Sequence, residues 1–543
     1  MNMLRLLPCA LAALLAPAAA EERCFAKDFM FGSATASYQV EGAYMDVGRT
    51  SSIWDDFCRQ RPGLDCANVA DDFFHCYPSD LKMMADDGLQ SFRFSVSWSR
   101  MAKNKLVPIL TIYHWDLPSA LQTELSPAGW LSEDIVRHYV DFATLMFQEF
   151  GDKLDYWTTF NEPYSFVTQG YGTGVHAPGF TGSENNTYIV THNLLRAHAL
   201  AVQKFREFRD AGIVRPTARI GIVLVAHMMF PLDPANPKDV AAAERALQFE
   251  YGWFLQPLIS GDYPAVMREV VGDRLPRFSK QEAEIIKGSY DLFMINHYAS
   301  KSVTDCDSPT SKRSCDQLTL GWEKDKGVDD TRAPEGSRLS SKGRHGNHNC
   351  GWFTAYPPGY LALMKWVSAH DPSADVLLTE NGWCGNDEVD NQDQMWYYEN
   401  YMEQVYKAVT EENIKVIGYT AWSYLDNYEW GSFEPRFGLY YVNFTSQTGS
   451  KDYVSAKPTE LERIPRPAAK WFSKLAKTKS IPSASDAVAA SAPSASSSSS
   501  GGLSIWSIVG IVVLAAAVIG AAVAGIRAFS RRRGSNGERR PLL

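Results

Sequence analysis

Eight short runs of apolar and β-branched residues alternate along this chain with longer stretches of helical periodicity. The short runs are residues 29–31, 91–97, 107–113, 156–160, 219–225, 292–296, 376–379 and 416–421. The helical stretches are residues 79–87, 133–150, 188–210, 237–259, 280–287, 394–412 and 468–477. Strands that alternate with helices indicate parallel β-α-β units. Eight strands predict an α/β fold of the (β/α)8 TIM-barrel class, with functional side chains at the carboxyl ends of the strands.

The two ends of the chain are not expected to belong to this fold. Residues 1–20 contain one basic residue, Arg5, then an apolar run and small residues, which is typical of a secretory signal peptide. Residues 503–526 are uncharged and mostly apolar, long enough as a helix to cross the roughly 30 Å hydrocarbon core of a membrane. Residues 527–543 are strongly basic, so this tail is expected in the cytoplasm. The pattern predicts a single-pass type I protein of the plasma membrane or an endolysosomal or vacuolar membrane, with its folded domain extracellular or lumenal.

Residues 480–502, ahead of the apolar segment, are rich in Ser, Ala and Pro and are expected to form an exposed stalk. A glycosylphosphatidylinositol signal is the alternative for the apolar segment, but the basic tail and the lack of a polar spacer favour a transmembrane helix. Near the end, Glu538, Leu542 and Leu543 resemble an acidic dileucine signal for sorting adaptors, and a plain charged stop-transfer tail explains them equally well. These assignments leave residues 21–479 for the barrel.

The charge of the chain narrows the choice of ligand. With 53 basic and 62 acidic side chains the formal net charge is −9, which does not favour binding to nucleic acid. Because the tail is basic, the lumenal part is more acidic still, and a small neutral ligand is favoured over a polyanion. His345, His348 and Cys350 lie close together without a fourth spaced ligand, so no metal or other cofactor is expected.

Cysteine usage agrees with an oxidising compartment. Outside the signal the number of cysteines is even. Cys58 and Cys66 are close enough in sequence to close a loop, and so are Cys306 and Cys315, although spacing alone does not fix the pairing. Two Asn-X-Thr sequons for N-glycosylation suit the same compartment.

Polar motifs follow the third, fourth and seventh predicted strands. Glu162 follows the fourth strand in Asn-Glu-Pro, Glu380 follows the seventh in Thr-Glu-Asn-Gly, and His114 follows the third. A single glutamate at such a place is more often a solvated loop carboxylate, but on a barrel both would point into one mouth. Two facing carboxyls are what cleavage of a glycosidic bond requires, one as proton donor and one as nucleophile, with their pKa values pushed apart. Arg93, at an inward position of the second strand, is expected to hold Glu380 ionised.

With these motifs the chain resembles glycoside hydrolase family 1, the β-glucosidase-like retaining enzymes. The resemblance covers nearly all of residues 24–479 and includes FGSATASYQVEG at 31–42 and AWSYLDNYEW at 421–430. It implies that Glu162 is the acid/base and Glu380 the nucleophile of a double displacement on terminal β-D-glucosyl or related residues. It also implies that Arg93 and Tyr298 flank the nucleophile, and that Trp422 forms a stacking platform for the sugar. The residues it assigns to sugar binding are Gln39, His114, Asn161, Tyr298, Trp422, Glu429 and Trp430.

Other members of the resembled family have activities that are alternatives to O-glucoside hydrolysis. Relatives that cleave thioglucosides replace the acid with Gln, whereas Glu162 is kept here. Phosphosugar enzymes lose the Glu-Trp pair, whose carboxylate would repel a 6-phosphate, and that pair is intact here. A noncatalytic klotho-like receptor or pseudo-enzyme remains, but such members tend to lack one of the two glutamates. Three further aromatic residues fit either ligand contact or packing: Trp352, Phe437 and Trp383.

The connection between the second and third predicted strands departs from the barrel pattern. Residues 99–106 are too few for the loop, helix and return of a parallel β-α-β unit. We therefore expect the second barrel helix to be missing between Arg100 and Val107, through either an omitted segment or a damaged barrel. The intact catalytic motifs favour an omitted segment.

Overall fold

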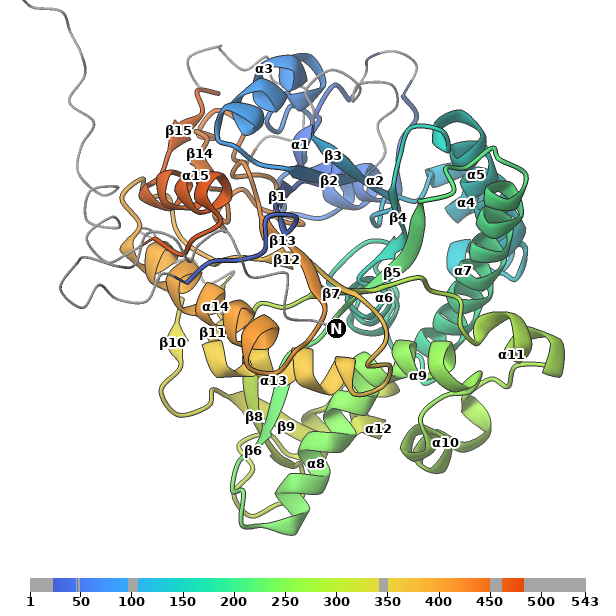
Figure 1. Cartoon of the computed structure of the whole chain (residues 1–543). Helices are drawn as coiled ribbons and strands as arrows, with labels where there is room; N and C mark the ends of the chain where they lie inside the picture. The colour runs from blue at the N-terminus through green and yellow to red at the C-terminus, as the bar shows by residue number, and fades with distance from the viewer. Residues whose placement is uncertain are drawn as a thin grey trace, which may run out of the picture. The chain divides into compact units, whose positions relative to one another are not determined.

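Eight parallel strands close into a barrel in the order β1, β13, β12, β7, β5, β4, β3, β2 (Figure 1). The predicted TIM barrel is therefore confirmed. Strands β4, β12 and β13 continue slightly further than predicted, and they end at Asn161, Asn381 and Trp422. The bounds are β1 (Met30–Ala34), β2 (Ser91–Ser95), β3 (Val107–Tyr113), β4 (Tyr156–Asn161), β5 (Arg219–Val225), β7 (Phe293–Asn296), β12 (Val376–Asn381) and β13 (Val416–Trp422).

The computed structural model describes residues 23–44, 46, 49–95, 106–340, 350–449 and 461–482. The predicted signal peptide, transmembrane segment, cytoplasmic tail and sorting residues lie outside these ranges and stay predictions. Among the described residues, no helix combines the length and apolarity needed to cross a membrane. Ile481 is buried and its N–H donates to the carbonyl of Arg23 at 3.0 Å, so the folded part continues slightly past residue 479.

Helices surround the barrel, and α5 and α7 lie side by side on its outside (Figure 1). The α-helices are α1 (Ser37–Val40), α2 (Ile53–Gln60), α3 (Phe73–Asp86), α4 (Ser119–Glu124), α5 (Asp134–Phe150), α6 (Pro163–Thr168), α7 (Asn186–Asp210), α8 (Pro237–Leu247), α9 (Trp253–Ser260), α10 (Ala265–Val271), α11 (Lys280–Ile286), α12 (Trp322–Lys326), α13 (Pro357–Ser368), α14 (Gln392–Thr410) and α15 (Pro467–Thr478). Helix α5 shows why such segments are helical, because its buried residues, including Ile135, Tyr139 and Met146, fall on one face at helical spacing.

Small sheets outside the barrel complete the fold. One has the order β6, β8, β9, and two others pair β10 with β11 and β14 with β15. Their bounds are β6 (Met228–Pro231), β8 (Ser300–Asp305), β9 (Val328–Arg332), β10 (Arg338–Leu339), β11 (Thr354–Ala355), β14 (Tyr440–Tyr441) and β15 (Ile464–Pro465).

Several helical segments differ from the prediction. Helices α1, α2, α4, α6, α10 and α12 lie outside the predicted helical stretches, and α3 begins at Phe73 instead of residue 79. The stretch 237–259 is not one helix, because a π-helical turn at Gln248–Gly252 separates α8 from α9. Helix α13 was not predicted either, and it begins with two prolines. Proline at the first helical position is in fact favourable, because its missing N–H has no partner there in any case.

Apolar side chains fill the lower part of the barrel interior. Ile109, Val223 and Leu377 belong to a buried cluster that also contains Leu292 and Met294. Nearer the carboxyl ends the interior becomes polar, and the Arg93 Nε donates to Thr111 Oγ1 at 3.2 Å. The barrel therefore has an apolar core toward the amino ends of its strands and polar side chains toward their carboxyl ends.

The connection from β2 to β3 consists of residues 96–106 alone, and β2 pairs directly with β3 in parallel register. Every other crossover between successive barrel strands contains at least one described helix. Residues 96–105 lie outside the described part of the chain, so the absence of the second barrel helix stays a prediction.

A buried ion pair joins the start of α15 to the segment after β13. Arg466 donates from Nη1 and Nη2 to the two carboxylate oxygens of Asp426, each at 2.8 Å, and both side chains are almost fully buried. Bidentate pairing satisfies both groups and fixes their relative orientation. The pair therefore ties the start of α15 to the loop between β13 and β14.

We predict that Arg466→Ala lowers the free energy of unfolding by about 3–5 kcal/mol, because Asp426 would stay buried without its bidentate partner. Denaturant unfolding followed by tryptophan fluorescence measures this. Arg215→Ala is the matched control, because its pair with Asp155 is about as short but well exposed, and its loss should cost less than about 1 kcal/mol. Equal losses in the two variants would contradict the prediction.

Candidate active site

A cavity of about 830 Å³ opens at the carboxyl ends of the barrel strands. The wall of this cavity contains most of the predicted site residues, contributed by the ends of β4, β12 and β13 and by segments that follow β3, β4, β7 and β13. Arg93 and Gln39 lie behind the wall and bond to residues in it. The predicted residues in the wall are His114, Asn161, Glu162, Tyr298, Glu380, Trp422, Glu429 and Trp430.

Glu380 is held by two donors. Arg93 Nη1 contacts Glu380 Oε1, and both side chains are nearly inaccessible to solvent. Tyr298 Oη donates to the other oxygen, Oε2, at 2.6 Å. A guanidinium and a hydroxyl that both donate to one carboxylate stabilise its ionised form. The expected partnership of Arg93 and Tyr298 with Glu380 is therefore present in the geometry.

The surroundings of Glu162 disfavour its charged form. Burial, and secondarily the negative charge of Glu380, raise the pKa of Glu162 to about 8. Asn296 Nδ2 donates to Oε1 at 2.7 Å and Ser165 Oγ donates to Oε2 at 2.9 Å, which offsets part of this rise in pKa. Glu162 therefore keeps its proton at neutral pH.

The backbone at Glu162 is constrained as well. Its φ is +44°, a left-handed conformation that a residue with a side chain seldom adopts, and Pro163 begins α6 directly after it. Trp430 has a similar φ of +47°. Left-handed residues at functional positions are held in place by the structure around them.

A chain of amide contacts connects the two glutamates. Arg93, which contacts Glu380, also donates from Nη2 to Asn161 Oδ1 at 2.6 Å. Asn296 Nδ2 donates to the same oxygen at 3.2 Å and to Glu162. The two carboxyls thus share one polar network.

Asn296 and Ser165 are functional residues that the sequence analysis missed. Asn296 is the last residue of β7, so the strand-end pattern that revealed Glu162 and Glu380 also applied to it. Thr379 orients it by donating to Asn296 Oδ1 at 2.7 Å. Ser165 lies on α6, three residues after Glu162, where a single serine carries no recognisable signal.

The side of the cavity around Glu429 is built to accept polar ligand groups. Trp422 Nε1 and Gln39 Nε2 each donate to the Glu429 carboxylate at 3.2 Å. Burial raises the pKa of Glu429, and these two donors oppose that rise. Within the described residues, Gln39 Oε1 and His114 Nδ1 are buried without a hydrogen-bond partner. Buried polar atoms are normally satisfied, so these two atoms are available to a bound hydroxyl.

His114 is neutral in this environment. Burial and the positive charge of Arg93 lower the pKa of His114 well below its usual value. Its Nε2 faces Asn161 Nδ2 at 3.0 Å, which assigns Nε2 as the acceptor and Nδ1 as the donor.

The outer part of the cavity is more mixed in character. Trp352 lies at its rim with 41% of its surface exposed, and Phe437 also lines the wall. Trp383 does not line the cavity and is completely buried in the core. Trp352 and Phe437 can therefore contact a ligand in the cavity, whereas Trp383 is part of the core. Other outer wall residues include Leu64, His176, His227 and Glu434.

Three disulfides lie in the described part of the chain. Cys58–Cys66 and Cys306–Cys315 confirm the two expected loop disulfides. Cys350–Cys384 was not predicted, because its partners are 34 residues apart in sequence. Among the described residues, no group of three His, Cys, Asp or Glu is placed to hold a metal ion, and His345 and His348 lie outside those residues.

The profile of Glycosyl hydrolase family 1 matches residues 21–104 and 100–481 of this chain. Beta-glucosidase 32 of Arabidopsis thaliana is 34% identical over 500 residues, covering 82% of this chain and 88% of the relative. Furostanol glycoside 26-O-beta-glucosidase of Hellenia speciosa is 35% identical over 503 residues, covering 84% of this chain and 83% of the relative.

Solved structures agree with the sequence relatives. The crystal structure of a rice β-glucosidase has a TM-score of 0.73 at 31% identity, covering 83% of this chain and 98% of the rice chain. The β-glucosidase of the fungus Humicola insolens, solved in complex with glucose, has a TM-score of 0.72 at 30% identity, covering 84% of this chain and 98% of the fungal chain. This chain belongs to glycosyl hydrolase family 1.

Proposed function

We propose that this protein removes terminal, non-reducing β-D-glucosyl or related residues by double displacement, with Glu380 as nucleophile and Glu162 as acid/base. The chain is an O-glycoside hydrolase of the β-glucosidase type, as its family membership and its relatives support. The observation that carries the residue assignment is the contrast between the two carboxyls. Arg93 and Tyr298 stabilise negative charge on Glu380, whereas burial keeps Glu162 protonated.

The reaction follows from these protonation states. In the first step a carboxylate oxygen of Glu380 forms a bond to the anomeric carbon. The bond to the leaving oxygen breaks, and that oxygen takes the proton of Glu162. In the second step Glu162, now ionised, takes a proton from water, the water oxygen bonds to the anomeric carbon, and the Glu380 ester breaks. A variant of the rice relative was solved in a covalent complex with glucose, which supports a covalent intermediate.

Recognition of the sugar falls to the residues around Glu429. We assign hydroxyl binding to Gln39, His114, Asn161, Glu429 and Trp430. The unpartnered Gln39 Oε1 and His114 Nδ1 support this assignment because a bound sugar would satisfy both. Trp422 supplies the flat face against which the C–H groups of a pyranose pack.

A noncatalytic klotho-like receptor is not favoured. Such a protein has no need of two facing glutamates with dedicated donors, whereas both glutamates are present here, with Asn296 donating to Glu162 and Tyr298 donating to Glu380. A neutral glycoside or oligosaccharide is accordingly the substrate we propose, without nucleic acid or cofactor.

We further propose that residues 503–526 anchor the enzyme as a type I membrane protein and that Glu538, Leu542 and Leu543 contact a sorting adaptor. The composition of these segments supports this proposal. We also propose that a segment is omitted between Arg100 and Val107, and the overlap of the two parts of the family match at residues 100–104 supports this.

We predict that Glu380→Gln lowers kcat/KM for p-nitrophenyl β-glucoside by about 10³-fold or more, because the amide cannot form the ester intermediate. Release of p-nitrophenol by the purified ectodomain measures this. Glu411→Gln changes an exposed carboxylate beyond α14 and should leave kcat/KM unchanged. Full activity in Glu380→Gln would reject Glu380 as the nucleophile, and a well-folded wild-type ectodomain without activity on any aryl β-glycoside would reject the proposed function.

The raised pKa of Glu162 predicts a basic limb in the pH profile. Only the protonated form donates a proton, so kcat/KM for a glucoside with a poor leaving group should fall about tenfold per pH unit above about pH 8. In Glu162→Gln this limb should be absent when the substrate is 2,4-dinitrophenyl β-glucoside, whose leaving group needs no proton. An unchanged limb near pH 8 in that variant would show that another group titrates there.

The proposed anchor predicts where the protein is found in cells. A chain that ends at residue 502 should be secreted into the medium, whereas the full chain should stay with membranes after alkaline carbonate washing. Cell fractionation and immunoblotting measure this. Membrane retention of the truncated chain would refute residues 503–526 as the anchor.

A further inference from the structure

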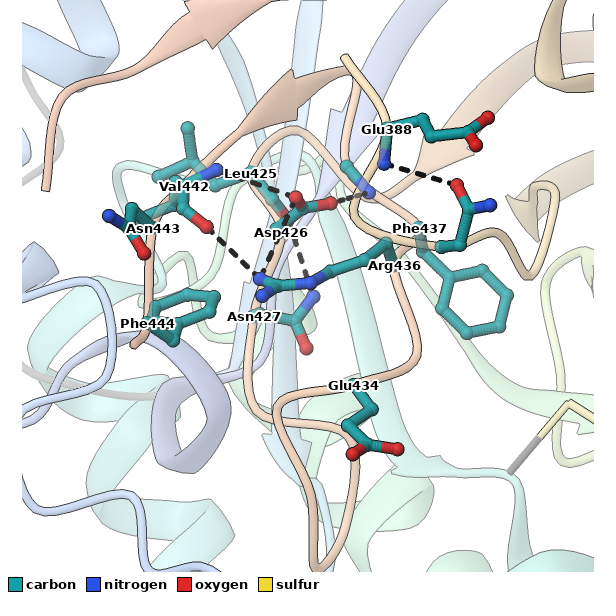
Figure 2. Close-up of polar contacts among 12 residues, drawn as sticks. Glu388, Leu425, Asp426, Asn427, Glu434, Arg436, Phe437, Val442, Asn443 and Phe444 are labelled. Carbon is teal, nitrogen blue, oxygen red and sulfur yellow. Dashed lines mark hydrogen bonds and ion pairs between the residues drawn. The ribbon is translucent and has the colours of Figure 1, made fainter. Parts of the chain in front are cut away.

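The loop between β13 and β14 carries Glu429 and Trp430, and its base is firmly anchored. Figure 2 shows Asp426 with its carboxylate turned toward the guanidinium of Arg436, and Asp426 also accepts a hydrogen bond from the Gly438 N–H at 2.9 Å. Arg436 Nη1 donates in turn to the carbonyl of Val442 at 3.0 Å. These contacts fix where the loop leaves β13 and where it approaches β14, but they do not reach its far end.

The far end of this loop is held by two residues from distant segments, Gln39 and Asp65. Gln39 Nε2 donates to the carbonyl of Tyr428 at 2.8 Å and to the Glu429 carboxylate at 3.2 Å, and Asp65 contributes both its backbone and its carboxylate. The Asp65 N–H donates to the carbonyl of Gly431 at 2.8 Å, and Tyr428 Oη donates to the carbonyl of Asp65 at 2.9 Å. Residues 428 and 431 immediately bracket Glu429 and Trp430. Asp65 therefore holds the loop on both sides of the pair that faces the sugar.

The carboxylate of Asp65 makes two further contacts. Its Oδ2 accepts from the Phe433 N–H at 3.1 Å, and its Oδ1 accepts from the Gly449 N–H at 2.6 Å. Only 6% of Asp65 is exposed and Phe433 is buried, so the Phe433 N–H is shielded from water and depends on this carboxylate, whereas Gly449 is exposed. An amide in its place could accept one of these hydrogen bonds but would turn its NH₂ group toward the other donor.

Asp65 itself sits in a small loop closed by a disulfide. Helix α2 ends at Gln60, and the Cys58–Cys66 disulfide joins the last turn of the helix to the residue after Asp65. Gly63 and Leu64, in the same loop, line the cavity together with Asp65. A disulfide around a short loop restricts the positions its residues can take.

We infer that Asp65, held in place by the Cys58–Cys66 disulfide, is a positioning residue that fixes Glu429 and Trp430 for recognition of the sugar. The inference rests on the proposed function, because it takes Glu429 and Trp430 as sugar-binding residues. Asp65 acts through the backbone of the loop and not through contact with the reacting atoms. An intact disulfide is then a condition for full selectivity, which suits an enzyme of an oxidising compartment.

The test compares substrates with and without the hydroxymethyl group of C6. Loss of the Glu-Trp pair in phosphosugar enzymes places this pair near C6, so β-xylosides, which lack that group, depend less on it. Asp65→Asn should lower kcat/KM for p-nitrophenyl β-glucoside by about 10-fold, mainly through KM, and for p-nitrophenyl β-xyloside by less than about 3-fold. A purely structural role for Asp65 predicts equal loss on both substrates, and that result would overturn the inference.

A second pair of variants separates the disulfide from general stability. Cys58→Ala with Cys66→Ala should shift the glucoside-to-xyloside ratio in the same direction as Asp65→Asn. Cys306→Ala with Cys315→Ala is the matched control, because it opens a disulfide of nearly equal span, 9 residues against 8, away from the cavity, and its ratio should stay unchanged. Equal ratios in the two double variants would refute the role of the Cys58–Cys66 disulfide, and thus the inference as stated. A wild-type enzyme inactive on both substrates would instead refute the proposed function.

Discussion

The buried contact between Arg93 and Glu380 is the interaction on which the site depends. An ionised carboxylate with almost no exposure is costly unless a cation and further donors compensate its charge, and here Arg93 and Tyr298 do so. Its negative charge then adds to burial in raising the pKa of Glu162. Burial, and secondarily the same guanidinium, lower the pKa of His114, which keeps that imidazole neutral. One buried cation thus contacts Glu380 directly and acts on the charge of His114.

The barrel makes this arrangement available from residues that are distant in sequence. Arg93, Asn161, Asn296 and Glu380 come from β2, β4, β7 and β12, whose carboxyl ends meet at one opening. Below them a packed apolar layer that includes Ile109, Val223 and Leu377 fills the barrel interior. Arg93 lies on β2, the strand from which the short connection to β3 begins.

Sequence patterns predicted the features that repeat or that follow a local rule. The eight strands were found because apolar runs recur between helical stretches, and Glu162 and Glu380 because polar residues end two of those strands. Asn296 was missed although it obeys the same strand-end rule. The roles of Asp65 and of Cys350–Cys384 depend on contacts between segments that are far apart in the chain, and no local pattern reveals such contacts. Helix α13 was missed although the two prolines at its start are compatible with the first turn of a helix.

The proposed mechanism requires that Glu380 becomes covalently bonded to the sugar. The most direct measurement is mass spectrometry of the purified ectodomain after incubation with 2,4-dinitrophenyl 2-deoxy-2-fluoro-β-glucoside, a substrate whose second step is slow. The account predicts one added fluoroglucosyl group per chain, located by peptide sequencing on Glu380. A label on any other residue, or release of dinitrophenol without a covalent adduct, would contradict it.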